Sequence, residues 1–375
     1  MNPTGFSVTL DGVDILDYNY KEKTLLEPQL EVELNTTDSF TFKMPPIHAS
    51  YGNLTPLVSI VEVYEDGDMI WFGRVLSVET DYYREKEVTC EGPYGFFNDS
   101  VQRYHVYEEV SLHEFFNTLI SNHNAQVPEA RRFTVGDINV SDKIVYRKLD
   151  YESTKSALET MIIDAEGGYL FFRRENGVNY IDWLNDMPYT CNQPVEFGLN
   201  MTNLTSRFDG EDLITCILPL GDTVRANDDP DKGEIIPESD ERVGKPLNLA
   251  HDYGTDLIAS EAVNTYGAII EVVTFSGIFD SAELKDKAEK YLKDEMYDRL
   301  TFECEAVELK KFGPGANDNY DHFKVGQLVR CKSRPHALDQ FFPLIKMSVQ
   351  LDTAVKTVTL GTAPRQKLTE IVKNG

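Results

Sequence analysis

A stretch of the chain near residue 75 recurs in altered form near residue 345, and this repeat limits the folds that the chain can adopt. The first copy reads WFGRVLSVETD from Trp71 to Asp81, and the second reads FPLIKMSVQLD from Phe342 to Asp352. Each copy leads, one residue out of step, into a second strand-like run, KEVT from Lys86 and KTVT from Lys356. Self-similarity at long range indicates one supersecondary unit used twice. Two β-hairpins can also look alike by chance.

Two similar units in one chain can imitate two subunits of a ring. A trimer of such chains would then present six similar units. The repeat therefore favours a ring-forming structural protein over an enzyme.

The chain is too long for one ordinary core, because 375 residues predict two to four domains. Its formal net charge is −27, from 63 acidic and 36 basic residues. This charge opposes the wrapping of a phosphate backbone, which needs Lys and Arg to release counterions. It also opposes docking on an anionic membrane. An acidic wall could let DNA slide past without adhering, and the alternative is a charged surface that keeps the protein soluble.

The cysteines are odd in number and far apart, which is typical of small buried residues in a reducing compartment. They are Cys90, Cys191, Cys216, Cys304 and Cys331. The first residues show neither the basic region nor the apolar core of a signal peptide. No run approaches the roughly 18 apolar residues of a membrane span.

Alternating hydrophobic residues over residues 1–97 predict half-buried strands, for example Ser39–Lys43 and Val58–Tyr64. Asp66 and Gly67 form a strong hairpin signal before the next strand. Pro, Gly and Asn punctuate the remainder. We interpret residues 1–97 as a first β-barrel domain.

Residues 98–195 read as a smaller α+β domain. Ser111 and Glu114 fit a capping box that opens a helix. A second helix is expected from about Thr154, ended by Gly167 and Gly168. A hairpin around Asn176–Gly177 follows it.

Residues 196–222 and 300–375 are assigned to a second β-barrel domain, and residues 223–299 to a domain inserted into it. The insertion holds a long polar loop, from Asp222 to Lys245, and an amphipathic helix from Ser281 to about Tyr297. The predicted fold class is therefore α+β, mainly β. It is multidomain, with two related β-barrel domains and smaller α+β domains.

The motifs of common enzymes are missing from the sequence. His113-Glu114 has no second His at helical spacing, so there is no HExxH zinc motif, and neither a GxSxG elbow nor a phosphate loop is present. A cysteine nucleophile at Cys90 or Cys191 has no His nearby in sequence. Carboxylate pairs for glycoside hydrolysis carry no signal, because 63 acidic residues always offer some pair. We predict no catalytic residue, no cofactor and no metal.

Two acidic loops, Asp229–Gly233 and Asn317–Asp321, place oxygen ligands as calcium sites do. Neither has the full twelve-residue pattern with its terminal Glu, and ordinary turn chemistry explains both. For the tyrosines Tyr82, Tyr83, Tyr104 and Tyr107, one reading is that they face a partner. Packing in the core or across strands is the preferred interpretation for them.

Three segments together resemble phage tail-tip hub proteins. Gly73-Arg74-Val75 leading to VTCEGPY (Val88–Tyr94) is similar to the end of their first domain. The helix from Thr154 followed by Gly167-Gly168-Tyr169-Leu170 resembles their second-domain helix and strand. TCILPLG (Thr215–Gly221) resembles their return strand, although Cys216 and Ile217 depart from the usual TRLYPxG. The family is the N-terminal module of siphophage tail-associated lysins, the prophage endopeptidase tail family.

This resemblance implies a homotrimer whose β-barrels form a pseudo-hexameric ring, akin to the baseplate hub of contractile tails. The ring would cap the tail tube, seat on a distal tail protein ring and open for DNA ejection during host attachment. The DNA would pass an acidic channel without specific binding. The protein would be assembled in the bacterial cytoplasm and belong to the virion tail tip, without membrane insertion.

Many relatives carry a C-terminal lytic domain. This chain ends soon after the second barrel, so it resembles a short form or a truncated piece. The alternatives are a tail enzyme that degrades the cell wall, as an endopeptidase or peptidoglycan hydrolase, and a carbohydrate-binding adhesion module.

Overall fold

The computed structural model describes residues 4–208, 214–226, 236–275, 278–297, 300–306, 308–310, 317, 319–336 and 338–361. The chain divides into two compact units. The first joins Met1–Thr205 to Phe302–Gly375, and the second is Ser206–Thr301. No described helix is both long and apolar enough to cross a membrane.

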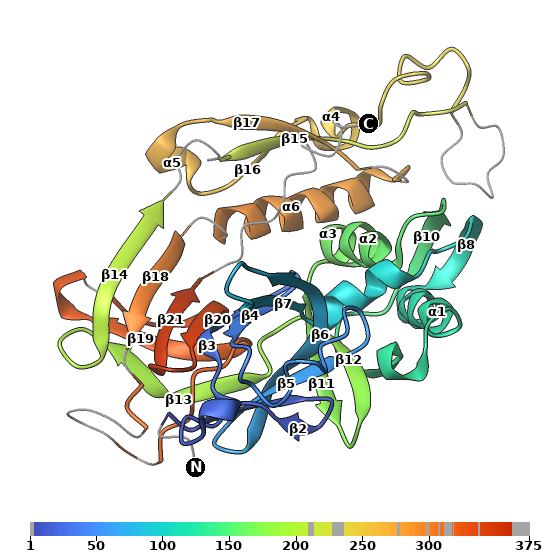
Figure 1. Ribbon diagram of the computed structural model, residues 1–375. Coiled ribbons are helices and arrows are strands. Elements are labelled where there is room, and N and C mark those ends of the chain that lie inside the picture. Colours follow the sequence, from blue (N-terminus) through green and yellow to red (C-terminus); the bar gives the residue numbers. More distant parts are fainter. Residues whose placement is uncertain are drawn as a thin grey trace. The chain divides into compact units, whose positions relative to one another are not determined.

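A 13-stranded sheet dominates the first unit, and its strands come from both ends of the chain. The order along it is β14-β18-β21-β20-β3-β4-β7-β6-β5-β1-β2, with β19 pairing β20 and β13 pairing β19 (Figure 1). The strands are β1 (Phe6–Leu10), β2 (Val13–Asp14), β3 (Leu26–Glu33), β4 (Ser39–Met44), β5 (Ile60–Glu65), β6 (Asp68–Thr80), β7 (Lys86–Glu91), β13 (Tyr189–Glu196), β14 (Met201–Phe208), β18 (Leu300–Ala306), β19 (Gln327–Ser333), β20 (Leu338–Gln350) and β21 (Val355–Leu360).

The sheet contains two copies of one block of strands. The first block, β3-β4-β7-β6, and the second block, β14-β18-β21-β20, follow each other in the sheet order. Each block also includes the strand before its long one, β5 or β19, which pairs antiparallel with the first half of the long strand. The burial patterns agree, since inward and outward residues alternate in the same phase in β5 and β19 and in β7 and β21. This topology supports the duplication predicted from the sequence.

The register fixes which residues of the two blocks are equivalent. Val75 pairs with Cys90 immediately before a bulge in β6, and Leu344 pairs with Leu360 immediately before a bulge in β20. Val75 therefore corresponds to Leu344, whereas the sequence comparison had set it opposite Lys346. The two-residue slip keeps every side chain on its own face, because the period of a strand is two. Sequence similarity alone cannot detect such a slip.

The two blocks share one hydrophobic core. Phe40, Val63 and Val88 from the first block pack in the same cluster as Val329 and Val358 from the second. The related β units expected from the sequence are therefore parts of one continuous sheet around a common core. The predicted fold class, α+β and mainly β with several domains, is confirmed.

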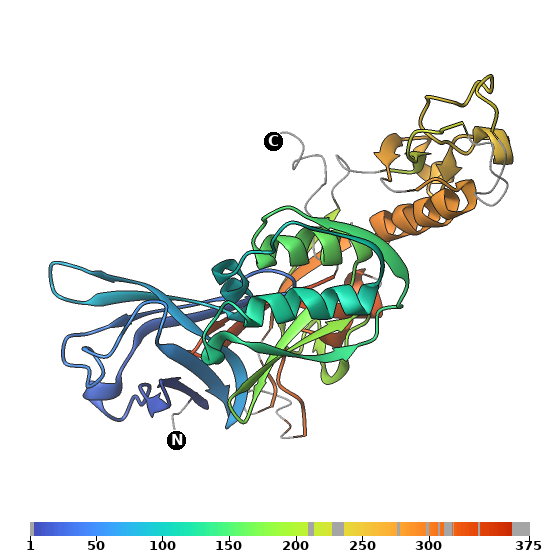
Figure 2. The same cartoon turned by 90° about the vertical axis from the view of Figure 1, so that its right-hand side faces the viewer.

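An α+β module within the first unit follows the first block. Its elements are β8 (His105–Ser111), α1 (Leu112–Asn124), β9 (Phe133–Ile138), β10 (Ile144–Leu149), α2 (Thr154–Leu158), a π-helical turn (Glu159–Ile163), α3 (Asp164–Glu166), β11 (Tyr169–Glu175) and β12 (Val178–Leu184). Helices α1 and α2 pack on the sheet β11-β12-β9 (Figure 2).

The local signals of this module act as expected. The Ser111 side chain accepts a hydrogen bond from the Glu114 backbone N–H. Gly167 and Gly168, both with positive φ, end the helical segment, and Asn176–Gly177 turns the hairpin with positive φ at both residues.

The second unit has a small sheet of its own. Its elements are β15 (Cys216–Leu220), α4 (Ala250–Tyr253), β16 (Ile258–Ala259), α5 (Val263–Tyr266), β17 (Ile270–Thr274) and α6 (Ser281–Tyr297). Ala288 and Leu292 of α6 pack with Ile217 of β15. The sequence interpretation assigned residues 216–220 to the second β-barrel, but β15 pairs with β16 and β17 instead. The other domain boundaries stay predictions.

Candidate functional site

The junction between the two strand blocks is the first feature with a functional geometry. β3 of the first block pairs antiparallel with the second half of β20, from Lys346↔Glu33 to Gln350↔Gln29. The backbone N–H of Leu34 donates to the carbonyl of Ile345 at 2.9 Å, and that of Leu351 donates to the carbonyl of Pro28 at 3.0 Å. The blocks are therefore joined by continuous sheet hydrogen bonding.

Side chains reinforce the same junction on both faces of the sheet. On the inner face Leu30, Met347 and Val349 are buried together in the shared core. On the outer face Lys346 Nζ lies 3.0 Å from a carboxylate oxygen of Glu33. Because this ion pair is exposed, it contributes at most about 1 kcal/mol to stability. The junction is therefore stabilised mainly by its buried apolar residues and by the backbone hydrogen bonds between β3 and β20.

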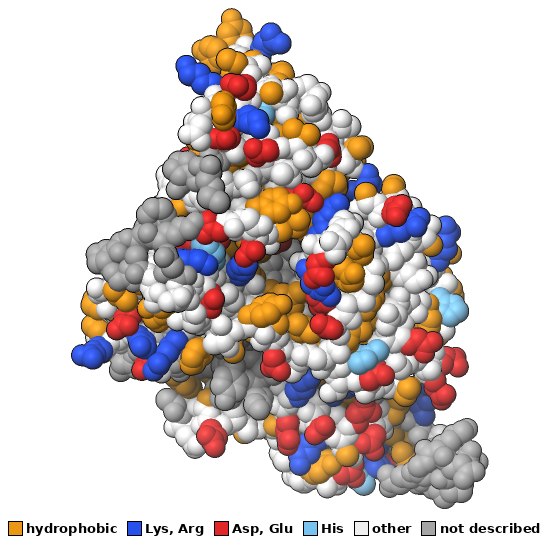
Figure 3. All heavy atoms as spheres, turned by 90° about the horizontal axis from the view of Figure 1, so that it is seen from below, with side chains coloured by type: hydrophobic (Ala, Val, Ile, Leu, Met, Phe, Trp, Pro, Cys, Tyr) orange, Lys and Arg blue, Asp and Glu red, His pale blue; other side chains and the backbone are white. Residues whose placement is uncertain are grey.

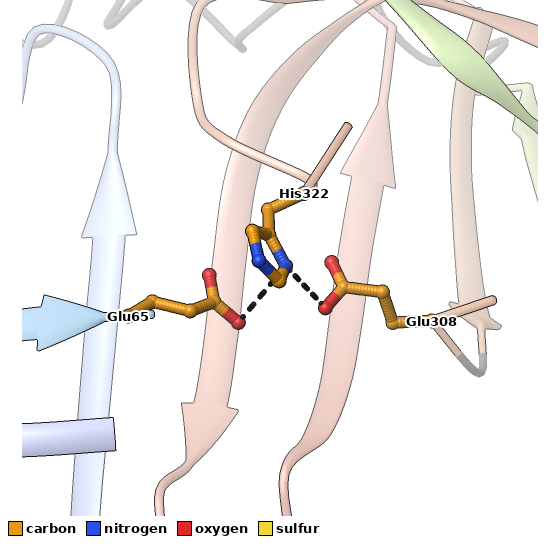
Figure 4. Close-up of side chains that lie close together, drawn as sticks. All are labelled: Glu65, Glu308 and His322. Atoms are coloured by element: carbon orange, nitrogen blue, oxygen red, sulfur yellow. Dashed lines mark hydrogen bonds and ion pairs between the residues drawn. The ribbon is translucent and has the colours of Figure 1, made fainter. Parts of the chain in front are cut away.

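A buried ion cluster links distant parts of the same unit, and Figure 4 shows three of its members, Glu65, Glu308 and His322. Lys356 in β21 is 1% exposed, and its Nζ lies 2.7 Å from Glu65 Oε1 and 2.8 Å from Glu308 Oε1. His322 Nδ1 lies 2.6 Å from Glu308 Oε2 and its Nε2 lies 2.9 Å from Asp66 Oδ2. Glu65 ends β5 and Asp66 follows it, Lys356 lies in β21 of the second block, and Glu308 and His322 lie in the connection between β18 and β19. The cluster therefore ties the two blocks together by charge.

The carboxylates of this cluster have pKa values shifted in opposite directions. Burial acts to raise the pKa of Glu308, but hydrogen bonding with His322 and the charge of Lys356 outweigh it and lower the pKa to about 2. Burial raises the pKa of Glu65 despite the opposing charge of Lys356. Glu308 is therefore the carboxylate that the cluster holds most firmly in its charged form.

Glu65, Glu308 and His322 are also a set of donors that could hold a metal ion, since one ligand atom from each lies within 4.8 Å of the others. The ammonium of Lys356, however, already lies between the two glutamates. A metal ion would have to displace this cation. The two glutamates are thus already paired with a cation of the chain itself.

A second buried ion pair lies in the first block. Arg74 of β6 is 2% exposed. Its guanidinium donates to Glu91 at 2.7 Å through Nε, and it also pairs with Asp99. Asp99 in turn pairs with Arg131 at 2.8 Å. This network connects the long hairpin to the start of the α+β module, and all its charged groups are paired.

A serine–histidine contact in the α+β module resembles a catalytic pair only superficially. Ser100 Oγ lies 2.7 Å from His123 Nδ1, and His123 Nε2 lies 3.0 Å from the Arg131 carbonyl. Ser100 is 2% exposed and His123 0% exposed. Burial lowers the pKa of His123. Since no substrate reaches this pair, its geometry is that of a packed polar core.

A cavity of about 170 Å³ lies between the first block and the α+β module. Trp71, Phe72 and Phe172 line it together with Asp38. Burial raises the pKa of Asp38 to about 7, against the hydrogen bond that it accepts from the Glu33 backbone N–H. Glu33 and Lys324 also line the cavity, and the negative charge of Glu33 adds to the raised pKa of Asp38. The carboxylate of Glu33 itself is paired with Lys346.

The residues discussed from the sequence fall in unrelated places. Cys90 and Cys191 are buried, and burial raises the pKa of both thiols, that of Cys191 to about 11. His113 Nε2 lies 2.7 Å from the Val140 carbonyl, near the start of α1. These contacts are structural.

Of the two calcium-like loops, only Asn317–Asp321 falls, in part, within the described residues. Asp229–Gly233 lies outside the described residues. In the other loop, Asn192 and Asp321 exchange backbone-to-side-chain hydrogen bonds at 3.0 and 2.8 Å. This exchange is ordinary loop anchoring, as turn chemistry predicts.

The tyrosines do not all pack as preferred from the sequence. Tyr82 and Tyr83 are 93% and 78% exposed at the turn between β6 and β7, and the tip of this hairpin projects from the unit in Figure 2. Tyr104 is also largely exposed, while Tyr107 packs against Phe115. The packing interpretation is therefore wrong for Tyr82 and Tyr83. Both residues lie in a turn, where no neighbouring strand covers a side chain. Their position in the turn could have predicted their exposure from the sequence.

Sequence reasoning missed the ion cluster. Lys356 lies two residues before Val358 in an alternating strand, and Glu65 lies two residues after Val63. Both charges therefore fall on the inward face, and inward charges of opposite sign in two strands indicate a buried pair. Glu308 and His322 lie in connections, where no periodicity marks them.

Comparison with known proteins finds phage tail proteins that are similar to this chain in sequence or in fold. Residues 190–371 match the family described as "Prophage endopeptidase tail". The match covers β14 and the rest of the second block as well as the second unit. The resemblance to this family expected from the sequence is confirmed over residues 190–371. No curated protein is significantly similar to the chain in sequence.

Three solved structures share the fold over nearly their whole length. The 43 kDa tail protein of prophage MuSo2 from Shewanella oneidensis has a TM-score of 0.64 at 10% identity, covering 96% of this chain and 98% of that one. The tail protein from Neisseria meningitidis MC58 has a TM-score of 0.63 at 14% identity, with coverage of 96% and 98%. Prophage tail protein gp18 from Listeria monocytogenes EGD-e has a TM-score of 0.60 at 12% identity, with coverage of 98% and 97%.

Proposed function

We propose that this protein is a structural hub of a phage tail tip or baseplate. Three chains form a pseudo-hexameric ring that caps the tail tube and opens for DNA ejection during host attachment. The ring seats on a distal tail protein ring, and the protein acts without catalysis. It is assembled in the host cytoplasm and functions in the virion.

The observation that carries this proposal is the repeated strand block. The order β14-β18-β21-β20 followed by β3-β4-β7-β6 places two equivalent blocks side by side in one sheet, in the same orientation. Repetition of one heterologous contact closes into a ring when the rotation permits. Three chains supply six such blocks. The match of residues 190–371 to a phage tail family supports the same conclusion.

The polar clusters support a mechanical rather than a catalytic role. Lys356 is enclosed by its carboxylate partners, and the contact of Ser100 with His123 is buried. A hydrolase needs a nucleophile or an acid–base pair that substrate can reach. The ion cluster around Lys356 instead joins the two strand blocks, as expected of a part that transmits force.

The charge of the chain agrees with the passage of DNA without adhesion. With a net charge of −27, a ring of several copies repels phosphate over its surface. Acidic and basic side chains are mixed on the face in Figure 3. The repulsion therefore comes from the sum of many charges rather than from one acidic patch on the described part of this face.

The test is the oligomeric state of the purified chain. Light scattering coupled to gel filtration should give three times the 42.6 kDa mass of one chain, and negative-stain images should show a three-fold particle with a central hole. A monomer across the micromolar range would overturn the proposal. Clearing of Gram-positive cell walls in a zymogram would instead establish the enzymatic alternative, and binding of a glycan by a monomer would establish the adhesion module.

A further inference from the structure

The long strand β6 has a different neighbouring strand along each half of its length. Its first half pairs with β5, and the pairing ends at Ile60↔Arg74. Its second half pairs with β7 as far as Thr80↔Lys86. On the side opposite β7, no described strand pairs with residues 76–80. This half of β6 is therefore an open edge, which is a template for another strand.

The equivalent half of β20 is not open. By the register of the two hairpins, Leu76, Val78 and Thr80 correspond to Ile345, Met347 and Val349. Those residues of β20 are covered by β3, which belongs to the other block. The chain thus contains two equivalent strand edges. The edge of β20 is paired with β3, and the edge of β6 has no described partner strand.

The side chains along the two edges differ in burial. Ile345, Met347 and Val349 are 2%, 3% and 0% exposed, whereas their counterpart Leu76 is 41% exposed. Val78 is only partly buried and Thr80 is exposed. A strand placed on β6 as β3 is placed on β20 would cover an aliphatic residue that now faces solvent.

The strand equivalent to β3 in the second block is β14. β3 flanks β4, and β14 flanks β18, which corresponds to β4. β14 is the last strand of the sheet order in the described part of the chain. The sheet therefore ends in β14, the equivalent of the strand that pairs with β20. The first block carries the unpaired edge of β6, the equivalent of the paired edge of β20.

We propose that β14 of one copy pairs antiparallel with residues 76–80 of β6 in a second copy of this chain. The contact reproduces the junction of β3 with β20 and continues the sheet from chain to chain. It is heterologous, with a donor strand on one copy and an acceptor edge on the next. This inference rests on the proposed ring and names the surfaces that close it.

The backbone groups that accept β14 follow from the filled junction. The carbonyl of Ile345 accepts a hydrogen bond from the Leu34 backbone N–H, so alternate residues 345, 347 and 349 direct their backbone toward β3. The corresponding residues of β6 are Leu76, Val78 and Thr80. Proline at Thr80 removes one outward N–H and leaves the hydrogen bonds to β7 in place, because an edge strand tolerates proline on its open side.

The first experiment compares Thr80→Pro with Thr80→Val in the full chain. Thr80→Val keeps the backbone N–H and is the matched control. We expect the wild type and Thr80→Val to be trimeric, and Thr80→Pro to dissociate to monomers at concentrations at least tenfold higher. Circular dichroism of Thr80→Pro should match the wild type, which shows that the hairpin itself is folded.

The second experiment tests the strand pairing directly and does not depend on a proline. Thr80→Cys is combined in turn with a cysteine at each of residues 201–205, and oxidised samples are separated without reductant. We expect crosslinked dimers and trimers only at alternate positions of the scan, because side chains of a strand alternate between faces. The described native cysteines are buried, and Thr80→Cys alone provides the background.

The outcomes separate this inference from the proposed function. A trimer that survives Thr80→Pro at unchanged affinity and shows no alternating crosslinks overturns the β14–β6 contact while the ring stands. Alternating crosslinks in open filaments overturn the closed ring while the contact stands. A wild-type monomer across the micromolar range overturns both.

Discussion

The first and second strand blocks have the same backbone but different polar chemistry. Lys86 and Lys356 hold the same register position, opposite Thr80 and Val349 in the two hairpins. Lys86 Nζ donates to the Tyr51 carbonyl at 2.6 Å and lies 4.1 Å from the Tyr51 ring. Lys356 is enclosed by two glutamates. The two blocks thus keep the same pairing register. The charge environment of each lysine depends instead on the side chains around it.

The two lysines allow the most demanding test of this comparison. Lys356→Met leaves Glu65 and Glu308 buried without their cation, which costs about 3–5 kcal/mol. Lys86→Met removes a hydrogen bond and a cation–π contact at a half-exposed site, which costs about 1 kcal/mol. Denaturant unfolding of both variants measures the two losses. Equal losses would show that Lys356 is no more tightly bound than its counterpart.

The acid dependence of stability sharpens the same contrast. The pKa of Glu308 lies at about 2, below the ordinary value of 4.5. Its stabilising contribution is therefore complete above pH 4.5 and is lost as the pH falls through about 2. That contribution is at most about 3 kcal/mol, and the raised pKa of Glu65 opposes it.

The measurement compares the wild type with Glu308→Gln. The difference in their free energies of unfolding should shrink as the pH falls from 6 to about 3. A difference that stays constant over this range contradicts the assignment of the lowered pKa to Glu308.

A glycine provides a third test, since Gly73 of β6 corresponds to the bulky Phe342 of β20. A Cβ added at Gly73 would lie 2.2 Å from the Glu91 carbonyl oxygen and 2.4 Å from the Trp71 ring. Gly73→Ala should therefore destabilise the fold by about 1–3 kcal/mol. Gly52→Ala, with no atom within 4 Å of the added Cβ, is the control. Melting temperatures that shift equally for both would refute the proposed crowding.

The hairpin turns should show the smallest effect. Tyr82 and Tyr83 contact each other, with ring centroids 5.4 Å apart, and are otherwise exposed. Tyr82→Ser combined with Tyr83→Ser should change the free energy of unfolding by no more than about 0.5 kcal/mol. Calorimetry of the double variant checks this value. A larger loss would give the turn of the first hairpin a structural role that its exposure does not suggest.

Local structure was predictable where the deciding physics is local. Ser111, Gly167 and Asn176–Gly177 set their caps and turns through side chains or positive φ within a few residues. The repeat was recognisable too, although its alignment was displaced by two residues, because hydrophobic alternation is unchanged by such a slip.

The candidate site was largely hidden in the sequence. Glu65 and Lys356 are separated by 291 residues, and only the folded sheet brings them together. The pairing of β3 with β20 likewise depends on which edges meet after folding. The strand β15 was placed in the wrong sheet because a short apolar run carries no information about its partner.

One connection in the second block has a consequence for how the chain tolerates change. The short turn 34–38 joins β3 to β4, whereas the whole second unit interrupts the chain between the equivalent strands β14 and β18. A floppy connection of that length would cost only about 2–3 kcal/mol more to close than the short turn, and the insert has a core of its own. Strand order here is therefore set by which strand edges pair rather than by chain continuity, and two adjacent strands of the sheet tolerate a whole folded unit between them.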